Sequence, residues 1–184
     1  EALCDSPVTH TSIVVCNDHE EVGSVSTSGA QGPLLRSVVD RLLASVGAEA
    51  DGFARLISQS AMLSIDNAHG IHPNFIDRHD DKHGPLLNKG PVIKVNANQR
   101  YASNSHSVAL FKSLCMKVGV TPQLFAMRAD MACGSTIGPI TSASLGIETV
   151  DVGVPTFGMH SIRELAGSDD ARALAKVVTA FFAR

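Results

Sequence analysis

The chain has 184 residues, of which 44% are hydrophobic and 18% charged, with a formal net charge of −3. This length and composition indicate one globular domain with a hydrophobic core and exclude a disordered chain. The slightly negative charge argues against nucleic acid or an anionic membrane as partner, and no segment approaches the ~18 apolar residues of a membrane span. The four cysteines form no CxxC pair, so we expect a reduced, cytoplasmic protein without a zinc ribbon or thioredoxin-type site.

In the first half of the chain, residues 11–16 form a short β-branched run that predicts a buried strand. Residues 32–47 predict an amphipathic helix closed by Gly47. Residues 56–65 are apolar enough for a strand that ends at Asp66, and the His-rich segment that follows predicts a long loop. The apolar positions of the predicted helix are Leu35, Val38, Val39, Leu42, Leu43 and Val46.

The second half alternates predicted strands and helices. Strands are expected at residues 91–96, 123–130 and 147–155, and the third of these is expected to be the last strand. Helices are expected at 104–119, 140–145 and 168–184, the last with Ser168 as its N-cap. This alternation predicts an α/β fold in which a layered sheet is flanked by helices. Functional sites in such folds gather at the carboxyl ends of strands, where Glu20, Glu21, Asp66 and His160 are expected.

The segment VVCNDHEEVGS, residues 14–24, carries adjacent glutamates directly after an apolar run. Neighbouring carboxylates oppose each other's ionisation, and a metal ion or a proton-transfer role relieves that conflict. Because neighbouring extended residues point to opposite sides, one glutamate would bind metal while the other faces a water as general base. A solvated acidic turn explains the same pattern.

Asp66 at a strand end is a suitable oxygen ligand for zinc or manganese, although an Asp at this place is also a common turn cap. The nearby histidines lack the H-E-x-x-H spacing, which argues against a zincin. Each one, taken alone, is expected at the surface or in a hydrogen bond. They are His69, His72, His79 and His83.

His160 lies in a Gly- and Pro-rich turn that would present a single imidazole. Lys94 interrupts the apolar strand PVIKVN, where a lysine needs a counter-charge or access to water. A cavity for an acidic substrate satisfies that need, and so does a solvent-facing strand position. The residues alone therefore indicate a metal-hydrolase crevice.

Five blocks together extend the interpretation, and they run from about residue 11 to the C-terminus: NDHEEVGS, DNAHGIHPN, HGPLLNKGPVIKVNANQRYASN, RADMACGSTIGPI and DVGVPTFGMHSIRELAGSDD. In order and spacing they resemble the aspartyl aminopeptidase family of cocatalytic metallopeptidases. The resemblance implies a zinc-exopeptidase catalytic domain of the phosphorylase/hydrolase-like type, built on a layered mixed sheet flanked by helices.

The resemblance also implies roles for individual residues. Glu20 would be the general base on a metal-bridging water. Glu21 and His160 would ligate one zinc, and Asp66 the second. His69 and Lys94 match positions of the substrate pocket. The implied cofactor is a pair of zinc ions, with manganese or cobalt as substitutes, and the implied partners are peptides with an acidic N-terminus and further copies in a homo-oligomer.

The chain departs from the family in what precedes HEEVGS. Family members carry a further histidine ligand, a bridging aspartate and an inserted oligomerisation domain upstream of that block. We therefore expect residues 1–184 to be the C-terminal part of one catalytic domain, incomplete at its N-terminal side, which alone binds metal weakly and hydrolyses little. The alternatives are a related cocatalytic zinc exopeptidase of other specificity and an inactive assembly fragment.

Overall fold

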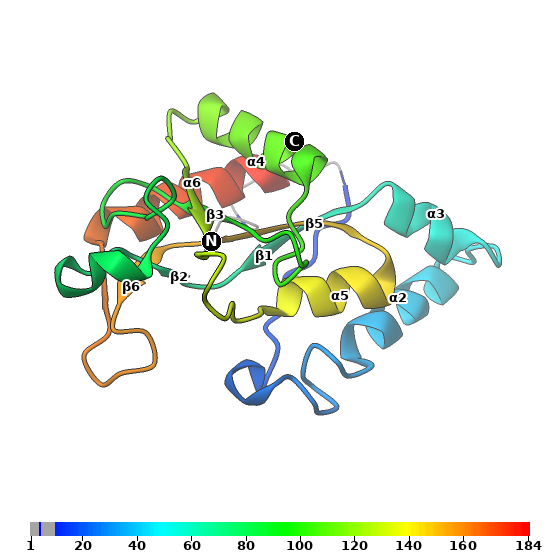
Figure 1. The fold of residues 1–184 in the computed structure, drawn as a ribbon. Helices are drawn as coiled ribbons and strands as arrows, with labels where there is room; N and C mark the ends of the chain where they lie inside the picture. Colours follow the sequence, from blue (N-terminus) through cyan, green and yellow to red (C-terminus); the bar gives the residue numbers. More distant parts are fainter. Residues whose placement is uncertain (1–3, 5–9) are drawn as a thin grey trace.

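The computed structural model describes Cys4 and residues 10–184. Its elements follow one another in the order shown in Figure 1. They are η1 (Glu20–Val22), α2 (Leu34–Ser45), α3 (Gly52–Ser58), β1 (Ala61–Ile65), β2 (Ala68–His69), η2 (Pro73–Arg78), β3 (Val92–Val95), α4 (Ser105–Lys117), β4 (Gln123–Ala126), α5 (Ile137–Leu145), β5 (Glu148–Gly153), β6 (Pro155–Phe157), β7 (Leu165–Ala166) and α6 (Ser168–Phe182).

The central sheet has the strand order β1-β5-β3-β4. β1 runs parallel to β5 and β3 parallel to β4, whereas β3 and β5 are antiparallel, so the sheet is mixed. Only Val154 separates β5 from β6, which belongs to a smaller sheet of order β2-β6-β7. Helices α4 and α6 cover one face of the central sheet, and α5 lies on the other (Figure 1). The predicted layered mixed α/β fold is confirmed.

The main core lies between the central sheet and helices α4 and α6. Its apolar side chains recur at helical spacing on α4 and α6 and at alternate positions on β5. Burying each of the larger ones contributes about 1.5–3 kcal/mol to folding. The buried members are Ile93, Phe111, Leu114, Cys115, Val150, Val152, Leu174, Val177 and Ala180.

The strand predicted at residues 56–65 is only partly correct. The first three residues of that range belong to helix α3, and β1 begins at Ala61. Phe53, Leu56 and Ile57 repeat at the i, i+3, i+4 spacing of a helix, and the side chain of Ser60 closes it by donating to the Leu56 carbonyl oxygen. Because residues 56–65 are apolar overall, the change from helical spacing to strand spacing within them is easily missed.

Residues 11–16 do not form the predicted buried strand. In the described part of the chain this segment has no ladder partner, and Val14 is 61% exposed. A β-branched run fits a strand, but a strand forms only where another backbone accepts its hydrogen bonds.

The C-terminal third corrects two further expectations. Two strands of the smaller sheet, β6 and β7, follow β5, so the strand predicted at residues 147–155 is not the last one. The N-cap of α6 is Gly167, not Ser168, so the N-cap residue has no side chain with which to cap the helix. Instead Asn88 Oδ1 accepts a hydrogen bond from the backbone N–H of Asp169, and the buried Asp170 accepts from the N–H groups of Asn88 and Gly90. A distant loop therefore caps the helix.

The remaining predicted elements are present with shifted ends. Helix α2 has the expected spacing, but among its residues only Val39 is buried, and Val38 and Leu42 remain exposed. Helix α5 begins at Ile137, three residues before the predicted start at residue 140. Within Cys4 and residues 10–184, no helix has the length and apolar character to cross a membrane.

Candidate active site

All the predicted site residues line one cavity of about 240 Å³ at the carboxyl end of β1, with Lys94 of the oppositely directed β3 in its wall. They come from η1, from the turn after β1, from β2 and β3, and from the loop between β6 and β7. This is where the strand-end argument predicts a site in an α/β sheet. The predicted residues in the wall are Glu20, Glu21, Asp66, His69, Lys94 and His160.

The two glutamates do not occupy the extended segment that the sequence argument assumed. They form a single 3₁₀ turn, held by a hydrogen bond from the Gly23 N–H to the Glu20 carbonyl oxygen. His19 and Ser24, on either side, have positive φ angles of 58° and 64°, which L-residues adopt at a cost. The tight turn, rather than strand alternation, therefore separates the two carboxylates.

Glu21 and His160 meet in the cavity. His160 Nε2 lies 2.7 Å from Glu21 Oε2, and both side chains are about two-thirds exposed, at 67% and 68%. The backbone of His160 has a φ of 65° in the left-handed region. Residues held in such conformations cluster at ligand clamps and active sites. The predicted partnership of these two side chains is consistent with this geometry.

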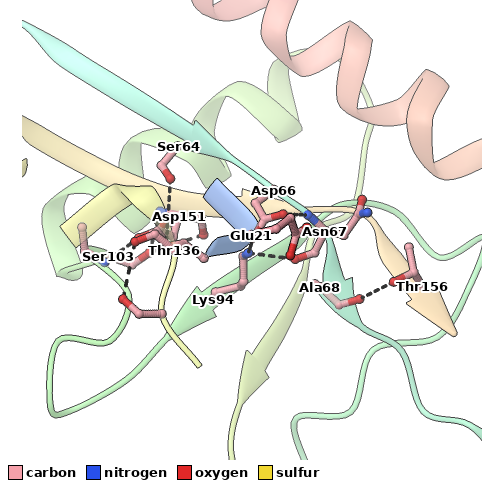
Figure 2. Close-up of polar contacts among 12 residues, drawn as sticks. Glu21, Ser64, Asp66, Asn67, Ala68, Lys94, Ser103, Thr136, Asp151 and Thr156 are labelled. Atoms are coloured by element: carbon pink, nitrogen blue, oxygen red, sulfur yellow. Dashed lines mark hydrogen bonds and ion pairs between the residues drawn. The ribbon is translucent and has the colours of Figure 1, made fainter. Parts of the chain in front are cut away.

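Lys94 is buried, with 2% of its side chain exposed, so the alternative of a solvent-facing strand lysine is wrong. Its Nζ donates to the Asn67 carbonyl oxygen at 2.8 Å and lies 3.4 Å from Asp66 Oδ2 (Figure 2). Asp66 Oδ1 also accepts from the Asn67 backbone N–H, as in a turn cap. The buried ammonium thus has the counter-charge it requires.

Burial shifts the pKa values of three groups in the cavity wall, raising that of Tyr101 as well as affecting Glu20 and His69. The pKa of Glu20 is raised because burial disfavours the carboxylate, and the charges of Asp66 and Glu21 add to this effect. The pKa of His69 is lowered by burial, and further by His79 and Lys94, which favours a neutral imidazole at pH 7. A carboxylate with a raised pKa is a better proton acceptor near neutrality than an ordinary glutamate.

The donor atoms fit part of a zinc site. Carboxylate oxygens from Glu21 and Asp66 and the imidazole of His160 are ligands that zinc uses, and they share one cavity. Over the described residues, however, no three His, Cys, Asp or Glu side chains are grouped closely enough to hold a metal ion. These residues therefore offer donor atoms of the right kind, but the described residues do not gather them into a metal site.

The sequence argument missed Asp151, a fully buried carboxyl group in the middle of β5. Its Oδ1 accepts hydrogen bonds from Ser64 Oγ at 2.5 Å and Thr136 Oγ1 at 2.8 Å, and its Oδ2 accepts from the Ala102 N–H at 2.5 Å (Figure 2). Thr136 itself lines the cavity, and Ala102 directly follows Tyr101 of the cavity wall. A carboxylate within the apolar run ETVDVG was the available signal.

Two of the other histidines of the loop make the local contacts expected of them singly, whereas His79 packs against Phe125 and its buried Nδ1 has no hydrogen-bond partner among the described residues. His72 Nδ1 accepts from the Asn74 N–H, and His83 lies 2.6 Å from Asp80. Neither lines the cavity. Tyr101 and Glu164 do line it, and neither was singled out from the sequence.

Comparison with known proteins assigns the chain to a family. Residues 2–182 match the family model described as aminopeptidase I zinc metalloprotease (M18). The chain is 57% identical over 182 residues to the probable M18 family aminopeptidase 2 of Ectopseudomonas mendocina, covering 99% of this chain and 42% of that protein. The chain thus spans less than half the length of the curated relatives it matches.

Solved structures agree with this assignment. The cryo-EM structure of the Ape4 and Nbr1 complex superposes with a TM-score of 0.87 at 43% identity, over 90% of this chain and 31% of that chain. The S. cerevisiae mApe1 dodecamer superposes with a TM-score of 0.78 at 32% identity, over 90% of this chain and 36% of that chain. From the family match and the shared fold, the chain belongs to the M18 family of aminopeptidase I zinc metalloproteases.

Proposed function

We propose that this chain contributes to an aminopeptidase that releases acidic residues, Asp and Glu, from the N-terminus of peptides. The observation that carries the proposal is the single cavity shared by Glu20, Glu21, Asp66, His160 and the buried Lys94. Three carboxylates, an imidazole and a buried ammonium together suit metal-assisted hydrolysis of a substrate that carries an anionic side chain.

In this proposal Glu21 and His160 hold one zinc ion and Asp66 holds a second. The bound ions supply Lewis acidity to the site. Glu20 takes a proton from the attacking water and delivers it to the leaving amine as the peptide bond breaks. The raised pKa of Glu20 supports both halves of that task, because the group must accept a proton and then release it.

Lys94 is the proposed determinant of acidic specificity. An ammonium has three donors, and two of those of Lys94 are directed at the Asn67 carbonyl oxygen and Asp66 Oδ2. Its remaining donor is available to a substrate carboxylate at the cavity wall. His69, neutral near pH 7, adds one N–H donor to the same pocket.

We further propose that residues 1–184 correspond to the C-terminal part of one catalytic domain, with further ligands contributed from elsewhere in a longer protein. The incomplete ligand grouping in the described residues and the 42% coverage of a relative support this. Homo-oligomer formation is supported by the dodecamer among the structural neighbours and by the exposed apolar side chains on α2. A cytoplasmic location fits cysteines that are all free in the described chain.

The deciding experiment measures metal content by elemental analysis and Asp-anilide hydrolysis on the same sample of this chain. Less than one metal per chain and negligible turnover are expected. About two metals per chain with turnover would contradict the proposal of an incomplete site. An assembly fragment without chemistry is the second candidate, favoured by the incomplete ligand grouping. It predicts that a longer protein with the upstream residues is also inactive.

A further inference from the structure

The β6–β7 hairpin places two ionisable side chains in the cavity wall, one at each end of its loop. His160 lies shortly after β6, and Glu164 directly precedes β7. The pairing of Phe157 with Leu165 fixes the base of the hairpin, and the Ser161 N–H donates to the Gly158 carbonyl oxygen within the loop. Because Glu164 adjoins a paired residue, its backbone position is set by the sheet and not by the loop alone.

The carboxylate of Glu164 can accept more hydrogen bonds than it does in this structure. Asn67 Nδ2 donates to Glu164 Oε1 at 3.5 Å, the long end of the hydrogen-bond range. Among the ion pairs of the described residues, none includes Glu164. A carboxylate offers about four lone-pair sites, so at least one oxygen remains free for a cationic ligand.

Glu164 lies beside residues that have roles in the proposed function, and this indicates which part of a substrate it would contact. Its partner Asn67 adjoins Asp66, and the carbonyl oxygen of the same Asn67 holds Lys94. Asn67 therefore lies between Glu164 and two residues with proposed roles: Asp66 as a zinc ligand and Lys94 as the partner of the acidic side chain. The proposed function gives the other three carboxylates of the wall their tasks, and Glu164 has none.

An exopeptidase that acts at the N-terminus must recognise the α-ammonium group of its substrate, which an internal peptide bond lacks. We propose that Glu164 accepts the α-ammonium group of the bound peptide and so confines cleavage to the first residue. This inference rests on the proposed aminopeptidase function. A charge-assisted hydrogen bond between a carboxylate and an ammonium is among the stronger polar contacts.

The test measures by titration calorimetry how much the amino group of a ligand contributes to binding, on the zinc-loaded longer protein that contains this chain. Two ligand pairs differ only in the amino group: L-aspartate against succinate, and L-leucine against 4-methylpentanoate. In the wild type the amine-bearing member of a pair should bind more tightly. Glu164→Gln should reduce that advantage about tenfold or more while zinc content is unchanged. Glu49→Gln, at an exposed site outside the cavity, should leave it unchanged.

Each contrary result has a distinct meaning. An amine advantage that persists in Glu164→Gln overturns the inference, as does the absence of any advantage in the wild type. Loss of zinc from Glu164→Gln also overturns it, because Glu164 would then be a ligand. If only the leucine pair binds, the acidic specificity of the proposed function fails, while the loss of amine advantage in Glu164→Gln still supports this inference.

Discussion

The imidazole of His160 lies 2.7 Å from the carboxylate of Glu21, although the two residues come from opposite ends of the chain. An ion pair with both side chains about two-thirds exposed adds at most about 1 kcal/mol to stability. Such a contact does not explain why the fold holds His160 in a left-handed conformation. The proposed zinc site would give the conformation a purpose, since both side chains carry donor atoms that zinc uses.

Replacing Glu20 by glutamine should abolish most turnover while leaving metal binding intact. Glutamine keeps the shape of the side chain but cannot take a proton from water, so kcat in the zinc-loaded holoenzyme should fall by about 10²–10⁴-fold. Elemental analysis and steady-state kinetics on the same sample measure both quantities. Loss of metal from Glu20→Gln would instead mean that the roles of Glu20 and Glu21 are reversed.

Replacing Lys94 by leucine should remove the preference for acidic substrates. Losing one charged hydrogen bond corresponds to about 10–100-fold in kcat/KM, so hydrolysis of Asp-anilide should fall by that factor relative to Leu-anilide. Lys112→Leu, on the exposed side of α4, is the matched control. An undiminished ratio in Lys94→Leu would show that the specificity lies elsewhere in the cavity.

Replacing Asp151 by asparagine should lower the free energy of unfolding. The amide would direct a donor at groups that are already donors, from Ser64 and Thr136 or from the Ala102 N–H. An unsatisfied buried polar group costs about 1–3 kcal/mol, which urea denaturation can measure. Asp169→Asn, exposed in the first turn of α6, should cost only about 0.5 kcal/mol. Equal losses would contradict a special role for Asp151.

The four cysteines should differ sharply in reactivity. Burial raises the pKa of Cys115 to about 11, so at pH 8 about one molecule in a thousand carries its thiolate. Raising the pH by one unit should increase that fraction about tenfold. Alkylation with iodoacetamide followed by peptide mapping should label the exposed Cys16 first and Cys115 only in urea. Similar rates in the native protein would contradict the burial of Cys115.

The fold was largely predictable because most elements carry their own periodicity. Helix α4 could be placed from its spacing, and its capping box at Asn104 and Ser107 agrees with the predicted start. The failures arose where a tertiary partner decides. Residues 11–16 have strand-forming side chains but no described ladder partner, and the start of α6 is capped by Asn88 from a distant loop.

The candidate site was predictable residue by residue only through the family resemblance, because single acidic or histidine positions have common structural explanations. Lys94 shows the limit: the strand was clear from the sequence, but the counter-charge that allows its burial comes from the turn after β1. Asp151 and Glu164 were missed for the same reason. Their roles depend on segments that the topology, and not the sequence order, brings beside them.

The central place of β5 also governs when the molecule can fold. β1 and β3 do not pair with each other, and each depends on β5 for its sheet partner on that side. During synthesis β1 therefore cannot make this pairing until Glu148–Gly153 leaves the ribosome. Pairing of β1 with β5 is consequently a late and non-local event, of the kind that slows folding.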